Sequence, residues 1–428
     1  MAGEVTLSDV NGLIKKVYDN SGLHNALPGS SILQRRIPYG EGGATKVSEG
    51  YQVGIVVRPP NGFTYSGSGG GVTQLKAPRN MVIKSATIAP FELELREQFA
   101  WAALSRAAEE GAASMGSLAG EGMKAMKFST ANRLELQILN GQRPIGIVES
   151  VADVTAGSIA DITITAGSWR PGMWPAIGEK ATLDAFTGTT KNNASGPLIT
   201  EGLTAATRKV RVSYSGGTLA NEVAAGDVLY FEGAWDGVTY NEMPGLIIQG
   251  SNTTGTSLGL SANTYQAWKG NTYDVAGEIT SDVVQSMMSG LRDRGAESRL
   301  TGYFGNKAYS ALIAEANAMR VIDSSYNSSK AKLGYKSIAY ETPELGEIEI
   351  VNHPFMAESE ALFVDDGDVL RTGSSDITFG IPGTKVDCPI FERVPGYTAA
   401  ELILFTDQCC MLKTPSRALF ASGITFGA

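Results

Sequence analysis

The chain has 428 residues, of which 43% are hydrophobic and 18% charged, a balance typical of a folded protein and not of a disordered one. The net charge is -9, but the charge is unevenly distributed: residues 1–100 hold ten basic and eight acidic side chains, so the acidic excess lies in the rest of the chain. A mostly acidic chain with only a slightly basic first quarter argues against a general nucleic-acid binder. A slightly basic first quarter on an acidic body suits contact with acidic neighbouring subunits, although solvated surfaces explain it equally well. The length allows two or three domains.

Glycine is abundant, at 51 residues, and 17 prolines accompany it, so we expect many turns and a strand-rich chain. The three cysteines, Cys388, Cys409 and Cys410, provide no disulfide framework and indicate folding in a reducing compartment. We expect the adjacent pair to be buried. Glu4 and Asp9 precede any apolar run, which argues against a signal peptide, and no uncharged apolar run reaches the ~18 residues of a membrane span. We therefore expect a soluble protein.

Residues 1–45 predict an arm. A short helical pattern runs from Val10 to Val17, and glycines and prolines then break any regular element. So little core-forming pattern would leave the segment poorly ordered alone, and we expect it to lie across a partner.

The stretch from Gln52 to Leu95 predicts a long projecting hairpin. Val53 to Val57 has the composition of a strand, residues 66–71 form a glycine-rich tip, and Phe91 to Glu97 alternates apolar and charged side chains. Such a hairpin has too little apolar content near its tip to build its own core, so it should reach outward.

A long helix is predicted next, from Gln98 to Asn140. The segment has no proline, carries an apolar stripe at three- and four-residue steps, and stops plausibly at Gly141. Its length would be ~60 Å at 1.5 Å per residue, too long for a compact core, which indicates a spine. Four glycines within it indicate a bend or the close approach of another segment.

Residues 151–275 predict an inserted β-barrel or sandwich, because short strand-like runs alternate with Gly, Asn and Thr clusters and no helical pattern appears. A mixed region follows, with helices from Ser281, as the cap, to Arg292 and from Lys307 to Met319. Strands are predicted at 300–304, 348–351 and 361–364, and Val394 to Thr414 is expected to close the chain as a hairpin that turns after Thr406.

Catalytic chemistry is not indicated. The two histidines, His24 and His353, are too few for a histidine-based triad or a multi-histidine metal site, and His353 is most simply a turn residue. The glycine tip lacks the spacing of a nucleotide-binding loop. The acidic run 365–368 predicts a solvated turn, with a structural cation as the alternative. We expect no enzyme activity, no cofactor and no metal.

The order of these parts resembles the major capsid (coat) protein of tailed double-stranded DNA bacteriophages, with the Hong Kong 97-type fold. The matching features are the arm, the glycine-tipped loop, a spine helix that ends at 136–141, the late α/β region and the closing sheet from Phe391. An inserted β domain containing 225–231 and 243–246 is similar to those of some members. The resemblance implies an α+β fold with five parts: an arm (1–45), an extended loop (46–95), a peripheral domain (96–150 and 376–428), an inserted β domain (151–275) and an axial domain (276–375).

The resemblance also implies self-assembly into the pentamers and hexamers of an icosahedral head shell that encloses double-stranded DNA without sequence-specific binding. The virion would be assembled in the host cytoplasm, with separate scaffolding and portal proteins and with decoration proteins as a further candidate. Inter-subunit contacts are expected, by region, at Arg35, Arg36, Phe63, Tyr65, Gly69, Gly70, Lys76, Arg79 and Lys84. Some members cross-link a loop lysine to a neighbour, but no catalytic carboxylate is identified here and we predict no such bond.

Three alternatives remain open at this point. A bacterial nanocompartment shell protein shares the fold but usually lacks an inserted β domain. Another β-rich virion protein, such as a tail or decoration protein, would share the composition, but the long helix argues against it. A carbohydrate-binding or hydrolytic protein built on the β region would need clustered aromatic side chains or an acid pair, which the sequence pattern does not indicate.

Overall fold

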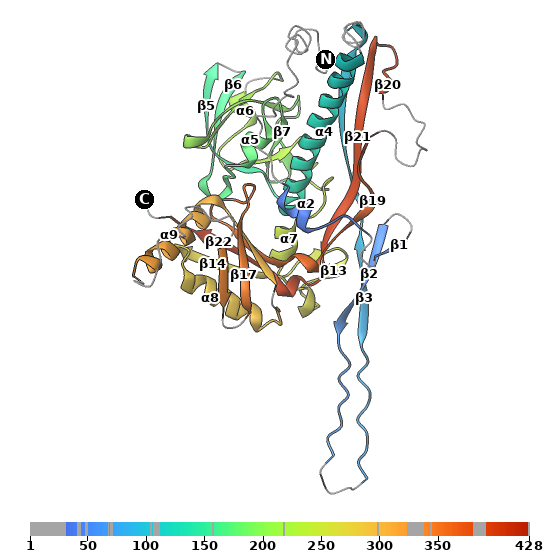
Figure 1. Ribbon diagram of the computed structural model, residues 1–428, viewed down its shortest axis with the longest axis vertical. Coiled ribbons are helices and arrows are strands. Elements are labelled where there is room, and N and C mark those ends of the chain that lie inside the picture. Colours follow the sequence, from blue (N-terminus) through green and yellow to red (C-terminus); the bar gives the residue numbers. More distant parts are fainter. Residues whose placement is uncertain are drawn as a thin grey trace.

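The computed structural model describes residues 31–40, 44–47, 50–66, 68, 72–102, 105, 112–155, 158–216, 219–297, 299–322, 338–342, 345–379 and 391–426. Figure 1 shows a broad body of sheets and helices from which a two-stranded hairpin projects. The helical pattern predicted at Val10 to Val17, the tip residues Gly69 and Gly70, and Cys388 lie outside the described residues.

The projecting hairpin is formed by β2 (Gly50–Arg58) and β3 (Val82–Ile88), with β1 (Thr45–Val47) on the other side of β2. Its antiparallel register runs from Tyr51 opposite Ile88 to Arg58 opposite Val82. Beyond this point the two arms have no strand assignment, although the Asn61 amide donates to the Arg79 carbonyl at 2.9 Å. Because β2 contains residues 53–57, the strand predicted there is confirmed.

The strand β4 (Phe91–Ala100) leaves the hairpin and joins another sheet. It pairs antiparallel with β21 (Ala399–Leu412) along its whole length, and β19 (Val369–Phe379) and β20 (Phe391–Arg393) complete this sheet. The prediction that 91–95 returns within the hairpin and that the spine begins at Gln98 is wrong. The two-residue alternation continues to Phe99, which packs with Met126 and Leu404 in a buried cluster under the sheet.

The closing segment also differs from its prediction. β21 is one unbroken strand through Thr406 and Asp407, where a hairpin turn was expected. Cys409 and Cys410 are buried on it, as predicted.

The spine is α4 (Ala112–Asn140), 29 residues and thus about 43 Å long. It ends before Gly141, as predicted. A Cβ on Gly122 would lie 3.2 Å from the ring of Phe99, so this glycine marks a close approach of β4, one of the two roles proposed for the spine glycines. Beside α4 lies the short arm helix α2 (Ile32–Arg36), which buries Leu33 against the body.

A closed β-barrel lies on the side of α4 opposite β21 (Figure 1). Its strand β11 (Val228–Phe231) pairs with both β5 and β7 and thereby closes the sheet. The remaining strands are β5 (Gly146–Thr155), β6 (Ile159–Ile164), β7 (Thr182–Thr187), β8 (Thr190–Lys191), β9 (Leu198–Thr204) and β10 (Lys209–Ser213). The helices α5 (Met173–Ile177), α6 (Leu219–Glu222) and α7 (Leu246–Ser251) were not predicted, because four to six residues are too few to establish a helical period.

The third sheet has the order β14-β22-β18-β15-β17-β16, and it is accompanied by α8 (Ser281–Arg292) and α9 (Asn306–Ile322). Its strands are β14 (Asn271–Gly277), β15 (Leu300–Phe304), β16 (Ile338–Thr342), β17 (Gly346–Asn352), β18 (Ala361–Asp365) and β22 (Leu419–Ile424). Residues 271–275 were expected in the inserted β domain and the final strand in the peripheral domain. Both belong to this sheet, so these two expected domain boundaries differ from the sheet's composition. The cap of α8 is Thr280, whose hydroxyl accepts from the Val283 amide, and not Ser281.

No helix among the described residues is long and apolar enough to cross a membrane.

A small hairpin of β12 (Thr256–Ser257) and β13 (Leu260–Ser261) lies at the base of the projecting hairpin, where the Leu258 carbonyl accepts from the Thr87 amide at 3.0 Å.

One buried carboxylate joins the arm, the spine and the third sheet. Glu135 on α4 accepts hydrogen bonds from the amides of Leu33 (2.7 Å) and Gln34 (3.1 Å), and it contacts Nε2 of His353 at 3.1 Å. The side chains of Glu135 and His353 are fully buried. His353 begins a turn, as expected, because its carbonyl accepts from the Met356 amide at 3.1 Å. Burial acts to raise the pKa of Glu135, but His353 and the two amides outweigh it and hold that pKa below its usual value.

Replacing Glu135 tests this junction. We expect Glu135→Gln to lower the free energy of unfolding by roughly 2–4 kcal/mol at pH 7, because it removes a buried charge from three partners. Since the pKa is depressed, this difference should be full above the unfolded pKa of ~4.3 and shrink as the pH falls through the folded pKa. Urea unfolding of the unassembled subunit measures it, with the exposed Glu94→Gln as the control. Equal effects of the two variants would contradict this role.

Candidate assembly interface

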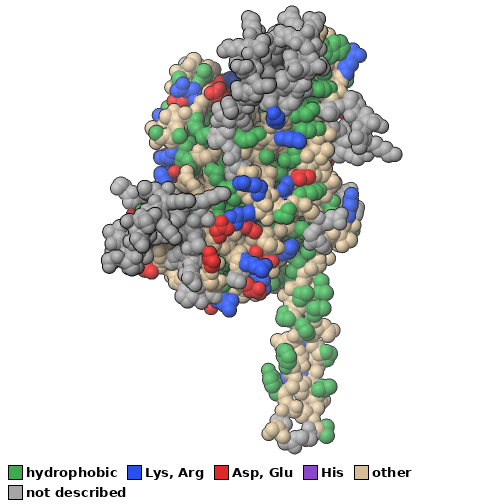
Figure 2. Space-filling view, in the orientation of Figure 1, with side chains coloured by type: hydrophobic (Ala, Val, Ile, Leu, Met, Phe, Trp, Pro, Cys, Tyr) green, Lys and Arg blue, Asp and Glu red, His purple; other side chains and the backbone are tan. Residues whose placement is uncertain are grey.

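The projecting hairpin exposes apolar side chains far from any core. Among its described residues, Phe63 is 67% exposed, Tyr65 85% and Leu75 81%. Figure 2 shows apolar side chains along both arms of the hairpin. Apolar groups held out in this way mark a surface for a partner, because their transfer from water is favourable and the chain supplies no cover.

The same hairpin is basic and contains no acid. Between Gly50 and Pro90 the sequence has Arg58, Lys76, Arg79 and Lys84 and no aspartate or glutamate. Its net charge is therefore positive on a chain whose total is -9. A partner surface for this segment should carry negative charge.

The base of the hairpin is firmly held. The hydroxyls of Tyr39 and Tyr51 both donate to the Gly373 carbonyl, each at 2.6 Å, and Ala86 and Ile88 are fully buried. A Cβ on Gly50 would lie 2.7 Å from the Ile88 carbonyl oxygen, so the strands meet at a position that suits glycine. The hairpin thus leaves the body in a defined direction.

The described residues that were expected at inter-subunit contacts are exposed, with the exception of Arg36. Phe63, Tyr65, Lys76, Arg79 and Lys84 are exposed together on the hairpin. Arg35 is exposed on α2, and its Nε donates to the Ser31 carbonyl at 3.1 Å.

Arg36 is held within its own chain. Its guanidinium pairs with Glu349 at 2.8 Å and with Asp366 at 3.3 Å, and these partners raise its pKa above the usual value. Asp366 also accepts from the hydroxyl of Tyr303 at 2.7 Å, so the acidic turn 365–368 is not a freely solvated one. No group of metal-binding side chains occurs among the described residues, this turn included.

The outer face of the β4–β21 pair carries more acids than bases, and the alternation within 91–97 indicated only its β4 side. Arg96, on this face, pairs with Glu401 at 3.6 Å. Glu92 lies directly opposite Asp407, and Glu94 follows on the same face of β4. Like charges directly opposite in a sheet are destabilising, which makes this face a favourable site for cations. The contribution of Asp407 was inaccessible from sequence because the two strands are about 300 residues apart and their register is set by the fold.

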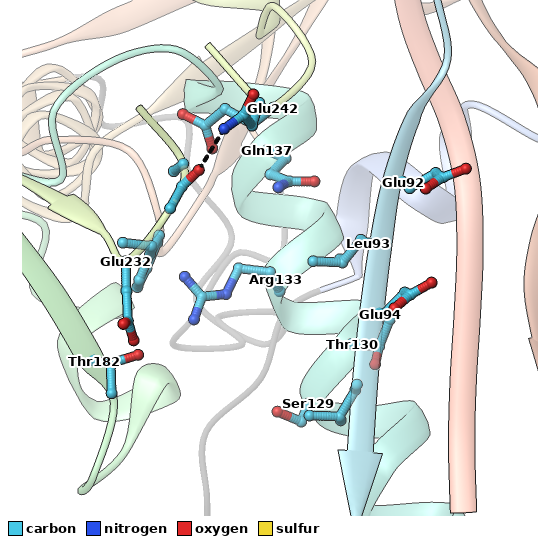
Figure 3. Close-up of a pocket in the computed structure, with 15 residues that line it drawn as sticks. Glu92, Leu93, Glu94, Ser129, Thr130, Arg133, Gln137, Thr182, Glu232 and Glu242 are labelled. Carbon is cyan, nitrogen blue, oxygen red and sulfur yellow. Dashed lines mark hydrogen bonds between the residues drawn. The ribbon is translucent and has the colours of Figure 1, made fainter. Parts of the chain in front are cut away.

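A cavity of about 360 Å³ lies behind this sheet, between α4 and the end of the barrel (Figure 3). Arg133 of α4 reaches into it and stacks on Phe231, with Cζ 3.1 Å from the ring centroid. Burial lowers the pKa of Arg133 to about 10, although Glu242 opposes this shift. Burial likewise raises the pKa of Glu242 to about 7, against the opposing hydrogen bond from the Gln142 amide at 2.7 Å.

A pH-dependent stability follows from Glu242. Because its folded pKa is raised, the wild-type subunit should lose stability as the pH rises from ~4.5 through about 7. Glu242→Gln mimics the neutral acid, so we expect the unassembled variant to be roughly 2–3 kcal/mol more stable than wild type at pH 8 and nearly equal at pH 5. Urea unfolding at the two pH values measures this. A difference independent of pH would contradict the assignment.

Known proteins resemble this chain along most of its length. Residues 102–370 match the family described as SU10 major capsid protein. No curated protein sequence matches the chain. In solved structures, the chain is similar to a subunit from the capsid asymmetric unit of cyanophage A-1(L), with a TM-score of 0.51, 11% identity and 96% of each chain covered.

Two other solved phage structures align with lower scores. The mature capsid of bacteriophage PhiM1 gives a TM-score of 0.47 at 8% identity, covering 96% of this chain and 92% of that one. A Mycobacterium phage Bobi structure gives 0.44 at 12% identity, with both chains fully covered.

The family match covers more than half of the chain, and the cyanophage subunit has the same overall fold. The predicted α+β capsid fold is therefore confirmed. The chain belongs to the SU10 major capsid protein family and is a shell-forming major capsid protein of a tailed-phage head.

Proposed function

We propose that the hairpin 50–90 is a clasp that binds the outer face of the β4–β21 sheet on a neighbouring copy. The observation that carries this proposal is charge and exposure together: a basic hairpin without acids and with exposed apolar side chains, and an acidic sheet face that includes Glu92, Glu94 and Asp407. Contact of the two surfaces would bury apolar area and bring cations to the opposed carboxylates.

The clasp enlarges the interface without enlarging the core. A stable protein–protein interface buries roughly 1,200–2,000 Å² in total. A hairpin that stands out from the body can supply much of this area because both of its faces are accessible. The Tyr39 and Tyr51 hydrogen bonds at its base limit the orientational freedom that binding would remove.

The remaining parts take roles around this clasp. The arm 1–45 overlaps neighbouring subunits, the spine and β4–β21 sheet form the peripheral part of a capsomer, and the six-stranded sheet forms its axial part. The assembly is an icosahedral shell of pentamers and hexamers that encloses double-stranded DNA without reading its sequence, and the acidic chain keeps the DNA from adhering to the wall. Separate scaffolding, portal and decoration proteins and assembly in the host cytoplasm belong to this proposal.

Deletion of the distal hairpin tests the clasp. We expect removal of residues 63–79 to leave a folded, soluble subunit that forms no stable shells, because these residues carry exposed apolar groups and make few contacts with their own body. Circular dichroism checks the fold and electron microscopy checks for shells. Normal shells from the deletion variant would refute the clasp.

Charge reversal tests the docking face. Lys76→Glu with Arg79→Glu should raise the subunit concentration needed for assembly at least ~10-fold at low salt, since cations would be replaced by anions opposite carboxylates. Glu92→Lys with Glu94→Lys on the same chain should restore much of the loss. Light scattering of assembly reactions measures both effects, and Lys209→Glu on the barrel is the control for net charge. Reversal without effect, or without rescue, would exclude this face.

A further inference from the structure

The described structure contains the same dipeptide, Asn-Gly, in two opposite environments. Asn61–Gly62 lies on the projecting hairpin, whereas Asn140–Gly141 lies at the end of the spine. A third copy, Asn11–Gly12, is outside the described residues. Asparagine followed by glycine is prone to deamidation, because glycine has no Cβ to hinder attack of its backbone nitrogen on the asparagine side chain and because its backbone angles are free.

The hairpin copy is exposed and lightly held. Asn61 and Gly62 are both exposed, and their segment has no strand assignment. One backbone hydrogen bond, from the Asn61 amide to the Arg79 carbonyl at 2.9 Å, ties this point to the opposite arm. Within the described part of the chain, neither the Asn61 side chain nor the Gly62 amide makes a hydrogen bond. A segment with so few contacts opens locally at little cost in free energy.

The spine copy is locked at both reacting groups. Asn140 is 5% exposed, and its Nδ2 donates to the Phe355 carbonyl at 3.0 Å while its Oδ1 accepts from Arg143. The Gly141 amide donates to the Gln137 carbonyl at 2.9 Å, as the helix ends. The side chain that would be attacked and the nitrogen that would attack are thus both engaged. The chain therefore carries its own unreactive control.

We propose that Asn61 is a site of spontaneous deamidation in the unassembled subunit. The Gly62 backbone nitrogen bonds to Cγ of Asn61, the Cγ–Nδ2 bond breaks, and ammonia leaves with the proton that the backbone nitrogen gives up. Water then opens the resulting five-membered succinimide ring at either carbonyl and yields an aspartyl or an isoaspartyl residue. No group is oxidised or reduced, and water is the one co-reactant.

The product changes the charge of the hairpin. Between Gly50 and Pro90 the sequence has four basic side chains and no acid, so a carboxylate at position 61 is the first acid in this segment. The consequence for assembly rests on the proposed clasp, in which the hairpin binds an acidic sheet face of a neighbour. A new anion opposes that contact, so subunits that have aged before assembly should enter shells less readily than newly made ones.

Incubation of the unassembled wild-type subunit tests the modification itself. Peptide mapping by mass spectrometry should show aspartyl and isoaspartyl products accumulating at Asn61, several-fold faster at pH 8.5 than at pH 7, because the attacking nitrogen must lose its proton. Asn140 should stay intact over the same period, since its side chain and the next amide are engaged. No conversion at Asn61, equal conversion at Asn140, or an aspartyl product without the isoaspartyl one would overturn the proposal.

A substitution at the reacting side chain checks the ring mechanism. Asn61→Gln keeps a neutral amide at this exposed position but requires a six-membered ring. We expect its conversion to be at least ~10-fold slower than that of Asn61, equivalent to ~1.36 kcal/mol in the barrier. Conversion of Asn61→Gln at the wild-type rate would exclude the ring mechanism.

An assembly measurement tests the consequence and separates it from the clasp. Asn61→Asp imitates the aspartyl product and should raise the subunit concentration needed for assembly roughly threefold at low salt, whereas Lys209→Gln on the barrel, with the same change in net charge, should not. Equal behaviour of these two variants would overturn the consequence. If Lys76→Glu with Arg79→Glu still weakens assembly in that case, the clasp stands. If neither does, the clasp fails, while conversion of Asn61 is decided by mass spectrometry alone.

Discussion

The structure depends on the pairing of β4 with β21. The register is continuous from Phe91 opposite Gln408 to Ala100 opposite Ala399, and it joins a segment near the start of the chain to one near its end. This pairing holds the base of the hairpin against the body, because β4 follows β3 after only two residues. It also places Phe99 against Met126 and Gly122, so the sheet and the spine share a buried contact. The same register creates the acidic outer face that the proposed clasp would bind.

Two further junctions convert these elements into one body. Glu135 connects the arm, the spine and the third sheet through two backbone amides and His353, and the side chains of Glu135 and His353 are fully buried. Gly141 and Gly245 bring the end of the spine and the exit of the barrel into direct backbone contact. The first junction is rigid because a buried carboxylate with three partners cannot shift without losing them. The second is reinforced by Gln142, whose amide donates to the Glu242 carboxylate at 2.7 Å and whose side chain donates to the Glu242 carbonyl at 2.9 Å.

The sequence was sufficient for elements whose pattern is local. The β character of the inserted region, the end of the spine at Asn140, α8 and α9 follow from short-range periodicity and from glycine. The start of the spine was placed too early because the alternation of β4 runs into an alanine-rich segment that also has a helical stripe. Its partner strand, which decides the matter, is about 300 residues away.

The residues of the candidate interface likewise separate into those predictable from local sequence and those whose contacts only the fold determines. The exposure of the described hairpin residues could be predicted, since they lie within one continuous segment. Arg36 was expected at a subunit contact but binds Glu349 and Asp366, which only the fold brings near it. Arg133 and Glu242 carry no sequence motif at all, and their relation follows from the cavity that they share.

In the proposed shell, the hairpin of one subunit binds the β4–β21 face of another. A cryo-EM reconstruction of the assembled shell tests this contact, because it shows which chain contributes each residue. We expect Lys76 and Arg79 of one copy to lie against Glu92, Glu94 and Asp407 of its neighbour, with Phe63 and Tyr65 buried at the same interface. A hairpin that lies in solvent, folds back on its own subunit, or contacts a different face of the neighbour would contradict it.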